Sequence, residues 1–215
     1  MPTNFEVPLY LDYLAVFTWA LSGAILGVSK GYDLTGVFVV ALLSSVGGSM
    51  LRDGIFLNQP PPVVTNPYYL PLILLVTVLV GLFSRLLVTP RLRRHTNNLV
   101  DVIDAIGTPA FAVVGMQLSL AAGIPLPGVV LIGAVSGVGG GVLRDLLVGD
   151  VPALVQPGHH FALLLVFVCV LFLALTLSLG MSNNLAAWLA VGVFFVARAL
   201  TVRMDWRSQP LLPPT

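Results

Sequence analysis

Seven long apolar stretches follow one another along the chain, separated by short polar or proline-containing segments. A helix needs roughly 20 predominantly apolar residues to cross the hydrocarbon core of a bilayer, and each stretch approaches or reaches that length. We therefore predict an all-α membrane protein with seven transmembrane helices, over residues 10–28, 34–50, 68–88, 99–120, 127–148, 160–179 and 185–204.

The composition narrows the class of protein further. Of 215 residues, 57% are hydrophobic and only 9% are charged, and the mean hydropathy is +0.99. A soluble domain carries about 25% charged residues, so a water-soluble protein is excluded. A net charge of +1 without a basic stripe argues against a nucleic-acid partner. Since nucleophile-elbow, zinc-protease and phosphate-loop motifs are missing from the sequence, we expect no enzyme, cofactor or metal site.

A motif occurs twice in the chain. Ser-Ser-Val-Gly-Gly-Ser-Met-Leu-Arg-Asp at 44–53 reappears as Ser-Gly-Val-Gly-Gly-Gly-Val-Leu-Arg-Asp at 136–145, at an offset of 92 residues (144 − 52 = 92). Matches of charged, glycine and proline positions in one register predict an internal duplication. The same ungapped offset aligns Asp12 with Asp104, Gly31 with Gly123 and Pro60 with Pro152.

Each copy contains three predicted helices. Because an odd number of crossings reverses the chain, the second copy must lie inverted in the membrane. Inverted repeats are a common plan of transport proteins, with the functional site near the repeat interface. We predict a first repeat over 8–92, an inverted second repeat over 99–181, a separate seventh helix over 184–205 and a disordered tail over 206–215.

Basic residues indicate the orientation in the membrane. They gather at helix ends that share one side of the predicted bundle: Lys30, Arg91, Arg93, Arg94, Arg203 and Arg207. Lys and Arg favour the cytoplasmic side. The segment before the first helix holds Glu6 and no basic residue. We therefore expect the N-terminus outside and the C-terminus in the cytoplasm.

The two motifs end in charges that need a physical explanation. A charged residue at the bilayer centre costs roughly 2.5–3.5 kcal/mol on insertion scales, so Arg52-Asp53 and Arg144-Asp145 must be paired, hydrated or near an interface. The glycines before them weaken a helix by about 1 kcal/mol each. A helix break at this depth is tolerated only inside protein or beside a water-filled cavity.

Helical spacing collects these residues into stripes. Ser45, Gly48 and Arg52 share one face of the second predicted helix, and Gly137, Gly140 or Gly141, and Arg144 share the matching face of the fifth. Two such stripes, inverted and facing each other, can line a narrow hydrophilic path.

Close helix packing is the alternative interpretation of the same glycines. Small residues four apart let helices approach closely, and the Arg-Asp pairs would then be interfacial or buried clamps. The residues alone leave both interpretations open. They also leave two roles open for Asp12 and Asp104, at the starts of the first and fourth predicted helices. Each carboxylate suits the positive end of a helix dipole or a vestibule that attracts cations.

The duplicated Gly-Gly-x-x-Leu-Arg-Asp motif, in a chain of this length, resembles the prokaryotic trimeric intracellular cation channels, a family also labelled as putative glycine transporters. The resemblance covers about residues 8–205. It implies homotrimers in which each protomer holds a pore through the inverted repeats, lined by kinked second and fifth helices and permeable to potassium and other monovalent cations. By this resemblance the residues that match the family's two motifs are Gly47, Gly48, Arg52, Asp53, Gly139, Gly140, Gly141, Arg144 and Asp145. Together with Ser45 and Gly137 of the stripes, and Ser49 where the second copy has Gly141, they are the predicted pore-lining or gating residues.

Three functions therefore compete. The first is a homotrimeric potassium channel of a prokaryotic plasma membrane, in contact with membrane lipids and needing no cofactor. The second is a carrier for a small solute such as glycine, which would use the same inverted repeat for alternating access. The third is a structural membrane protein whose glycines only pack helices.

Overall fold

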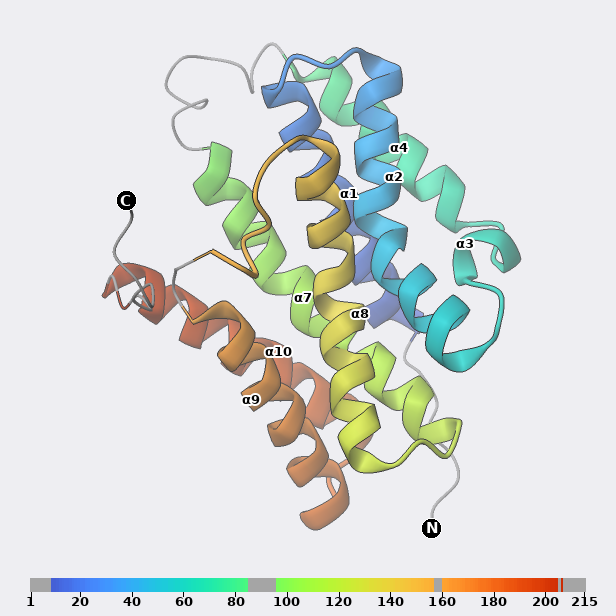
Figure 1. Cartoon of the computed structure of the whole chain (residues 1–215), viewed down its shortest axis with the longest axis vertical. Coiled ribbons are helices and arrows are strands. Elements are labelled where there is room, and N and C mark those ends of the chain that lie inside the picture. The colour runs from blue at the N-terminus through green and yellow to red at the C-terminus, as the bar shows by residue number, and fades with distance from the viewer. Residues whose placement is uncertain (1–8, 85–95, 157–159, 205, 207–215) are drawn as a thin grey trace.

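In the computed structural model, which describes residues 9–84, 96–156, 160–204 and 206, every regular element is a helix (Figure 1). In chain order these are α1 (Leu9–Ser29), α2 (Leu34–Met50), the π-helical η1 (Leu51–Leu57), α3 (Pro62–Thr65), α4 (Tyr69–Leu82), α7 (Thr96–Ala121), α8 (Leu126–Leu147), α9 (Phe161–Leu173), the π-helical η2 (Ala174–Ser178) and α10 (Asn183–Arg203).

The all-α membrane fold is confirmed. Within the described residues, six helical segments are long and apolar enough to cross a membrane: Leu9–Ser29, Leu34–Leu57, Asn98–Ala121, Leu126–Leu147, Phe161–Ser178 and Asn183–Arg203. The predicted helix over 68–88 appears as α4, which has 14 residues and is shorter than a full span.

Several expectations fall on residues that the structure does not describe. They concern residues 85–88 of the third predicted helix, Glu6, the basic positions 91, 93, 94 and 207, and the 206–215 tail apart from its first residue. The predicted orientation therefore stays a prediction.

Local sequence explains the turn that follows the first helix of each repeat, α1 or α7, and leads into the second, α2 or α8. Gly31 and Gly123, which are equivalent at the 92-residue offset (123 − 31 = 92), take positive φ angles of 80° and 73° just after α1 and α7. Glycine accepts this left-handed conformation without the steric cost of a Cβ atom. Asp33 then starts α2 by accepting a 2.8 Å hydrogen bond from the backbone N–H of Gly36.

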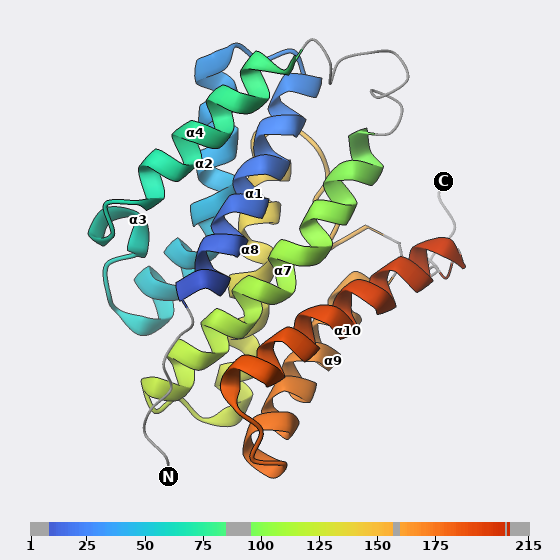
Figure 2. The same cartoon turned by 180° about the vertical axis from the view of Figure 1, so that it is seen from behind.

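Four helices form the centre of the bundle. α2 packs along α8 and α1 packs along α7. α4 covers α1 and α2 on one flank, while the tilted pair of α9 and α10 covers α7 on the other (Figures 1 and 2). The apolar core follows this division, with one cluster around α1, α2 and α4 and another around α7, α9 and α10. The Arg-Asp motifs thus belong to α8 and to the extension of α2, two of the four central helices, which pack along each other.

The expected helix break at the glycines is not found. α8 runs without interruption from Leu126 to Leu147, through all three of its motif glycines. α2 likewise passes through Gly47 and Gly48 and then continues as the π-helical η1, which carries Arg52 and Asp53. In the first copy the π-helical backbone begins only after the two glycines. The glycines themselves stay within α2, where they pack against α8.

Candidate functional site: two buried arginine clusters across a glycine seam

The two motif copies meet where their glycines touch. A Cβ atom on Gly48 would collide with the backbone carbonyl of Ser136, and a Cβ atom on Gly140 would collide with the carbonyl of Ser44. These contacts are reciprocal at the 92-residue offset (140 − 48 = 92, 136 − 44 = 92). Because residue 48 lies against 136 and residue 44 against 140, α2 and α8 run antiparallel along this glycine seam.

The reciprocity extends to the neighbouring glycines. An added Cβ on Gly47 would stand 2.7 Å from Leu143 Cδ1, and one on Gly139 would stand 2.9 Å from Leu51 Cδ1. Leu51 and Leu143 occupy equivalent positions of the motif. The close-packing interpretation therefore fits Gly47, Gly48, Gly139 and Gly140, all four of which lie in direct contact with the facing helix.

The other small residues of the predicted stripes have different neighbours. Gly137 lies against Thr108 of α7, and Gly141 lies against the Trp19 ring of α1. Ser45 and Ser49 are buried, and their hydroxyls donate to carbonyls of their own helix. The structure therefore brings the central glycines together, whereas Gly137 and Gly141 contact α7 and α1.

Arg144 lies at the centre of one buried cluster. It pairs with Asp145 at 2.8 Å and with Asp104 of α7 at 2.9 Å, and these side chains are at most 11% exposed. Its guanidinium also donates to the Ser22 hydroxyl, which itself donates to Asp104 at 2.6 Å. The Trp19 ring lies 5.3 Å from the guanidinium carbon, within cation–π range. Two carboxylates, a hydroxyl and an aromatic face together fix this arginine.

Arg52 forms a sparser cluster beyond the other end of the glycine seam. It makes a two-pronged ion pair with Asp53, with both bonds at 2.7 Å and both side chains fully buried. Gln59 donates to the same carboxylate at 3.0 Å, and Ser136 lies 3.5 Å from the guanidinium. A bidentate pair of this kind is the strong form of an arginine–carboxylate interaction.

The carboxylate equivalent to Asp104 is bound differently. Asp12 accepts a hydrogen bond from the Tyr69 hydroxyl of α4 and lies within electrostatic range of Arg52 and Asp53. Tyr69 aligns with Phe161 at the repeat offset (161 − 69 = 92), and phenylalanine has no hydroxyl. The helix-capping role is wrong for Asp104, which lies inside α7 and binds Arg144. Asp12 does lie in the first turn of α1.

Sequence reasoning missed several members of these clusters. Ser22 and Trp19 lie three residues apart in α1, which places them on one face of the helix. That spacing was the available signal for an inward polar stripe in α1. Tyr69 and Gln59 gave no such signal, because their partners lie on other elements.

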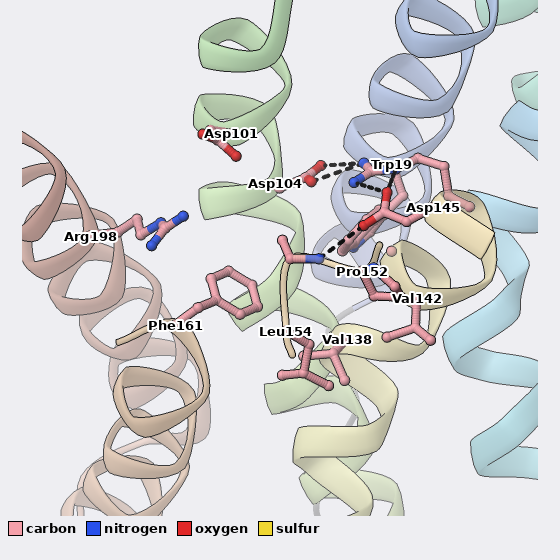
Figure 3. Close-up of a pocket in the computed structure, with 13 residues that line it drawn as sticks. Trp19, Asp101, Asp104, Val138, Val142, Asp145, Pro152, Leu154, Phe161 and Arg198 are labelled. Atoms are coloured by element: carbon pink, nitrogen blue, oxygen red, sulfur yellow. Dashed lines mark hydrogen bonds and ion pairs between the residues drawn. The ribbon is translucent and has the colours of Figure 1, made fainter. Parts of the chain in front are cut away.

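A small cavity opens beside the Arg144 cluster (Figure 3). Its volume is about 30 Å³, and a cavity needs roughly 10–15 Å³ to hold a water molecule. Residues of α1, α7, α8, α10 and the start of α9 line it, including Asp104, Arg144 and Asp145. Trp19 also lines this cavity, and its buried indole Nε1 has no hydrogen-bond partner among the described residues. A buried donor of this kind suits a hydrated cavity.

Comparison with known proteins defines the class to which this fold and site belong. A prokaryotic trimeric intracellular cation (TRIC) channel crystallised in 0.5 M KCl is 26% identical, with a TM-score of 0.82 over 92% of this chain and 96% of its own. The orthologue from Rhodobacter sphaeroides is 25% identical, with the same TM-score over 92% of this chain and 97% of its own. The chain thus has the fold of a cation-channel class of membrane protein.

The sequence family is shown as well. The family model described as "Glycine transporter" matches residues 9–85 and again residues 101–177, two stretches that start 92 residues apart (101 − 9 = 92). The chain belongs to this family, as the motif resemblance indicated, and the family is of channel or transporter type rather than an enzyme family.

Bacterial relatives share the name UPF0126. The UPF0126 membrane protein of Deinococcus radiodurans is 38% identical over 143 residues, which are 66% of this chain and 64% of the relative. The match therefore spans just under two thirds of that protein's length. YvgT of Bacillus subtilis, also a UPF0126 membrane protein, is 29% identical over 92% of this chain and 93% of its own.

Proposed function

We propose that this protein is a homotrimeric potassium-permeable channel, with one conduction path in each protomer between two three-helix repeats that lie inverted in the membrane. The observation that carries the proposal is the pair of buried Arg–carboxylate clusters beyond opposite ends of the α2–α8 seam. The same fold in solved cation channels supports it.

The charges of the clusters fit a permeant cation. Arg144 faces Asp104 and Asp145, and Arg52 faces Asp53 with Asp12 in electrostatic range. With these groups ionised, each cluster holds one guanidinium and two carboxylates, a formal charge of −1. A positive arginine would repel potassium, but its pairing removes that barrier and leaves carboxylate and hydroxyl oxygens, the ligands that hard cations prefer.

The glycine seam supplies the proposed gate. In the described conformation the backbones of α2 and α8 touch, so the path is closed between the two clusters. Opening requires the two helices to separate or slide. The glycine contacts are suited to this motion because at Gly48 and Gly140 backbone lies directly against backbone, with no side chain from either glycine between the helices.

Assembly and location complete the proposal. We place the protein in the plasma membrane of a prokaryote, because its relatives include YadS, an inner membrane protein of Escherichia coli. The N-terminus lies outside, the C-terminus in the cytoplasm, and α4 crosses the membrane as the third of seven spans. The trimer is carried over from the R. sphaeroides channel, which is described as trimeric. Lipids contact the exposed apolar side chains of α4, α9 and α10.

Single-channel recording tests this function. Purified protein in a planar bilayer with symmetrical KCl should give discrete current steps that reverse at the potassium equilibrium potential when a gradient is imposed. The double variant Arg52→Ala/Arg144→Ala should change the step size or open probability, whereas Arg203→Ala, which removes an exposed arginine of α10, should not. Electrical silence of the purified, folded protein would rule the channel out.

A glycine carrier is the second candidate, because the family model bears that description. The same inverted helices would then alternate access to a central site. Proteoliposomes separate the two functions. A carrier predicts saturable uptake of labelled glycine without current steps, and a channel predicts current that glycine does not alter.

A further inference from the structure

The cavity beside Arg144 is bounded by an arginine from outside the two motif copies. Arg198 of α10 is 8% exposed and lines this cavity together with Asp101 and Asp104 of α7. Its guanidinium carbon lies 5.1 Å from the centre of the Phe161 ring. Figure 3 shows the side chain reaching from α10 toward α7, above that ring.

Arg198 and Asp101 give the Arg144 end of the seam one further charge of each sign. The Arg144 end has three carboxylates on the cavity wall, from Asp101, Asp104 and Asp145, and two guanidiniums. Arg198 lies within electrostatic range of Asp101 and Asp104. At the opposite end, Arg52 is the single basic residue of its cluster as far as the structure describes it. With these groups ionised the net formal charge is −1 at both ends, and at the Arg144 end this balance depends on Arg198, the charge that the last helix adds.

We propose that Arg198 is a conductance-setting residue, whose charge lowers the local concentration of cations at the Arg144 end of the path and so keeps the current equal in the two directions. This inference rests on the proposed channel function. Coulomb's law in water gives about a twofold change in local cation concentration for a unit charge about 8 Å away. Salt screens such a charge, since the Debye length is about 10 Å at 0.1 M and about 3 Å at 1 M.

The charge predicts a specific pattern among variants at this position. Arg198→Gln should raise the unitary potassium conductance about twofold in one direction of current at 0.1 M KCl, and the difference should vanish at 1 M. Arg198→Lys keeps the charge but loses the planar group that stacks on Phe161, so it should keep the wild-type current–voltage relation. A merely structural role would give the opposite ranking and no dependence on salt.

Two further variants control the experiment. Arg203→Gln removes the same charge from the exposed end of the same helix, and should leave the current–voltage relation unchanged. Asp101→Asn removes a negative charge from the half-buried rim of the cavity. Asp101→Asn should lower the unitary conductance in the same direction of current in which Arg198→Gln raises it. It also keeps the proposal testable if Arg198→Gln does not fold.

The outcomes separate this inference from the proposed channel. If wild-type protein gives no current at any KCl concentration, the channel falls and Arg198's role falls with it. If wild-type protein conducts but Arg198→Gln and Arg203→Gln rectify alike, or Asp101→Asn shows no opposite effect, the channel stands and the role of Arg198 is wrong.

Discussion

The two arginine clusters come from one duplicated motif but differ in how firmly the arginine is bound. Arg144 has two carboxylates, the Ser22 hydroxyl and the Trp19 ring around it. Arg52 has one two-pronged carboxylate, while the second, Asp12, is bound by Tyr69. The positions of Ser22 and Trp19 are occupied by Val114 and Phe111 in the other copy (114 − 22 = 92, 111 − 19 = 92).

This difference indicates that the clusters at the two ends of the glycine seam have different roles. A buried charge with several partners is costly to move, because each lost partner leaves another polar group unpaired. The Arg144 cluster is therefore expected to act as a fixed anchor of α8 on α1 and α7. The Arg52 cluster, at the π-helical end of α2, is expected to rearrange first when the seam opens.

Removing each arginine tests the comparison most strongly. Arg144→Gln leaves two buried carboxylates facing each other and should lower the free energy of unfolding by about 4 kcal/mol. Arg52→Gln should cost about 3 kcal/mol, because Gln59 still donates to Asp53. Denaturation in mixed detergent micelles measures both values. An equal or reversed order would refute the anchor.

Alanine at the seam glycines should affect the two copies equally. Gly48→Ala and Gly140→Ala each force a Cβ atom against a facing carbonyl, and overpacking of this kind should cost about 3 kcal/mol at either site. Gly54→Ala is the matched control, because no atom lies within 4 Å of its added Cβ. Unequal losses for the two seam variants would show that the seam is not symmetrical.

Exchanging the tyrosine should make the first cluster resemble the second. Tyr69→Phe frees Asp12 to pair with Arg52, as Asp104 pairs with Arg144. The loss of the tyrosine hydrogen bond should cost about 1.5 kcal/mol, and the open probability should fall as Arg52 gains a partner. A double-mutant cycle with Asp12→Asn measures the coupling. Zero coupling energy would show that the Tyr69–Asp12 contact has no influence on Arg52.

The smallest effect is expected where the two copies touch at the surface. Lys30, after α1, pairs with Asp150, after α8, at 2.6 Å, and the side chains are 32% and 46% exposed. Lys30→Gln should cost only about 0.5 kcal/mol, because exposed ion pairs are well solvated, and 1 M salt should remove the difference. A loss as large as that of Arg52→Gln would mean that this turn holds the copies together.

The sequence predicts the helices well and their side-chain partners poorly. Helix positions follow from local apolar length, so the predicted stretches over 10–28 and 127–148 lie within about two residues of α1 and α8. The predicted helix over 34–50 is too short, because the chain continues beyond Met50 as the π-helical η1 as far as Leu57.

Partner choice depends on contacts between distant parts of the chain. Asp12 and Asp104 are equivalent in sequence, yet one binds a tyrosine of α4 and the other an arginine of α8. The repeat register pairs Tyr69 with Phe161. That this difference decides the partner of Asp12 becomes clear only from the packing of α4 against α1. The glycines were ambiguous for the same reason, since packing and path-lining require the same small residues.

Chemical access to α2 tests the central claim most directly, namely that each protomer conducts along the α2–α8 seam. In a Cys169→Ala background, Ser49→Cys and Ser45→Cys place a thiol on the buried face of α2, and Val39→Cys places one on its exposed face. A cationic methanethiosulfonate should block single-channel potassium current through both serine-position variants during channel opening and leave Val39→Cys unaffected. Undiminished current through the modified Ser49→Cys and Ser45→Cys proteins would contradict the account.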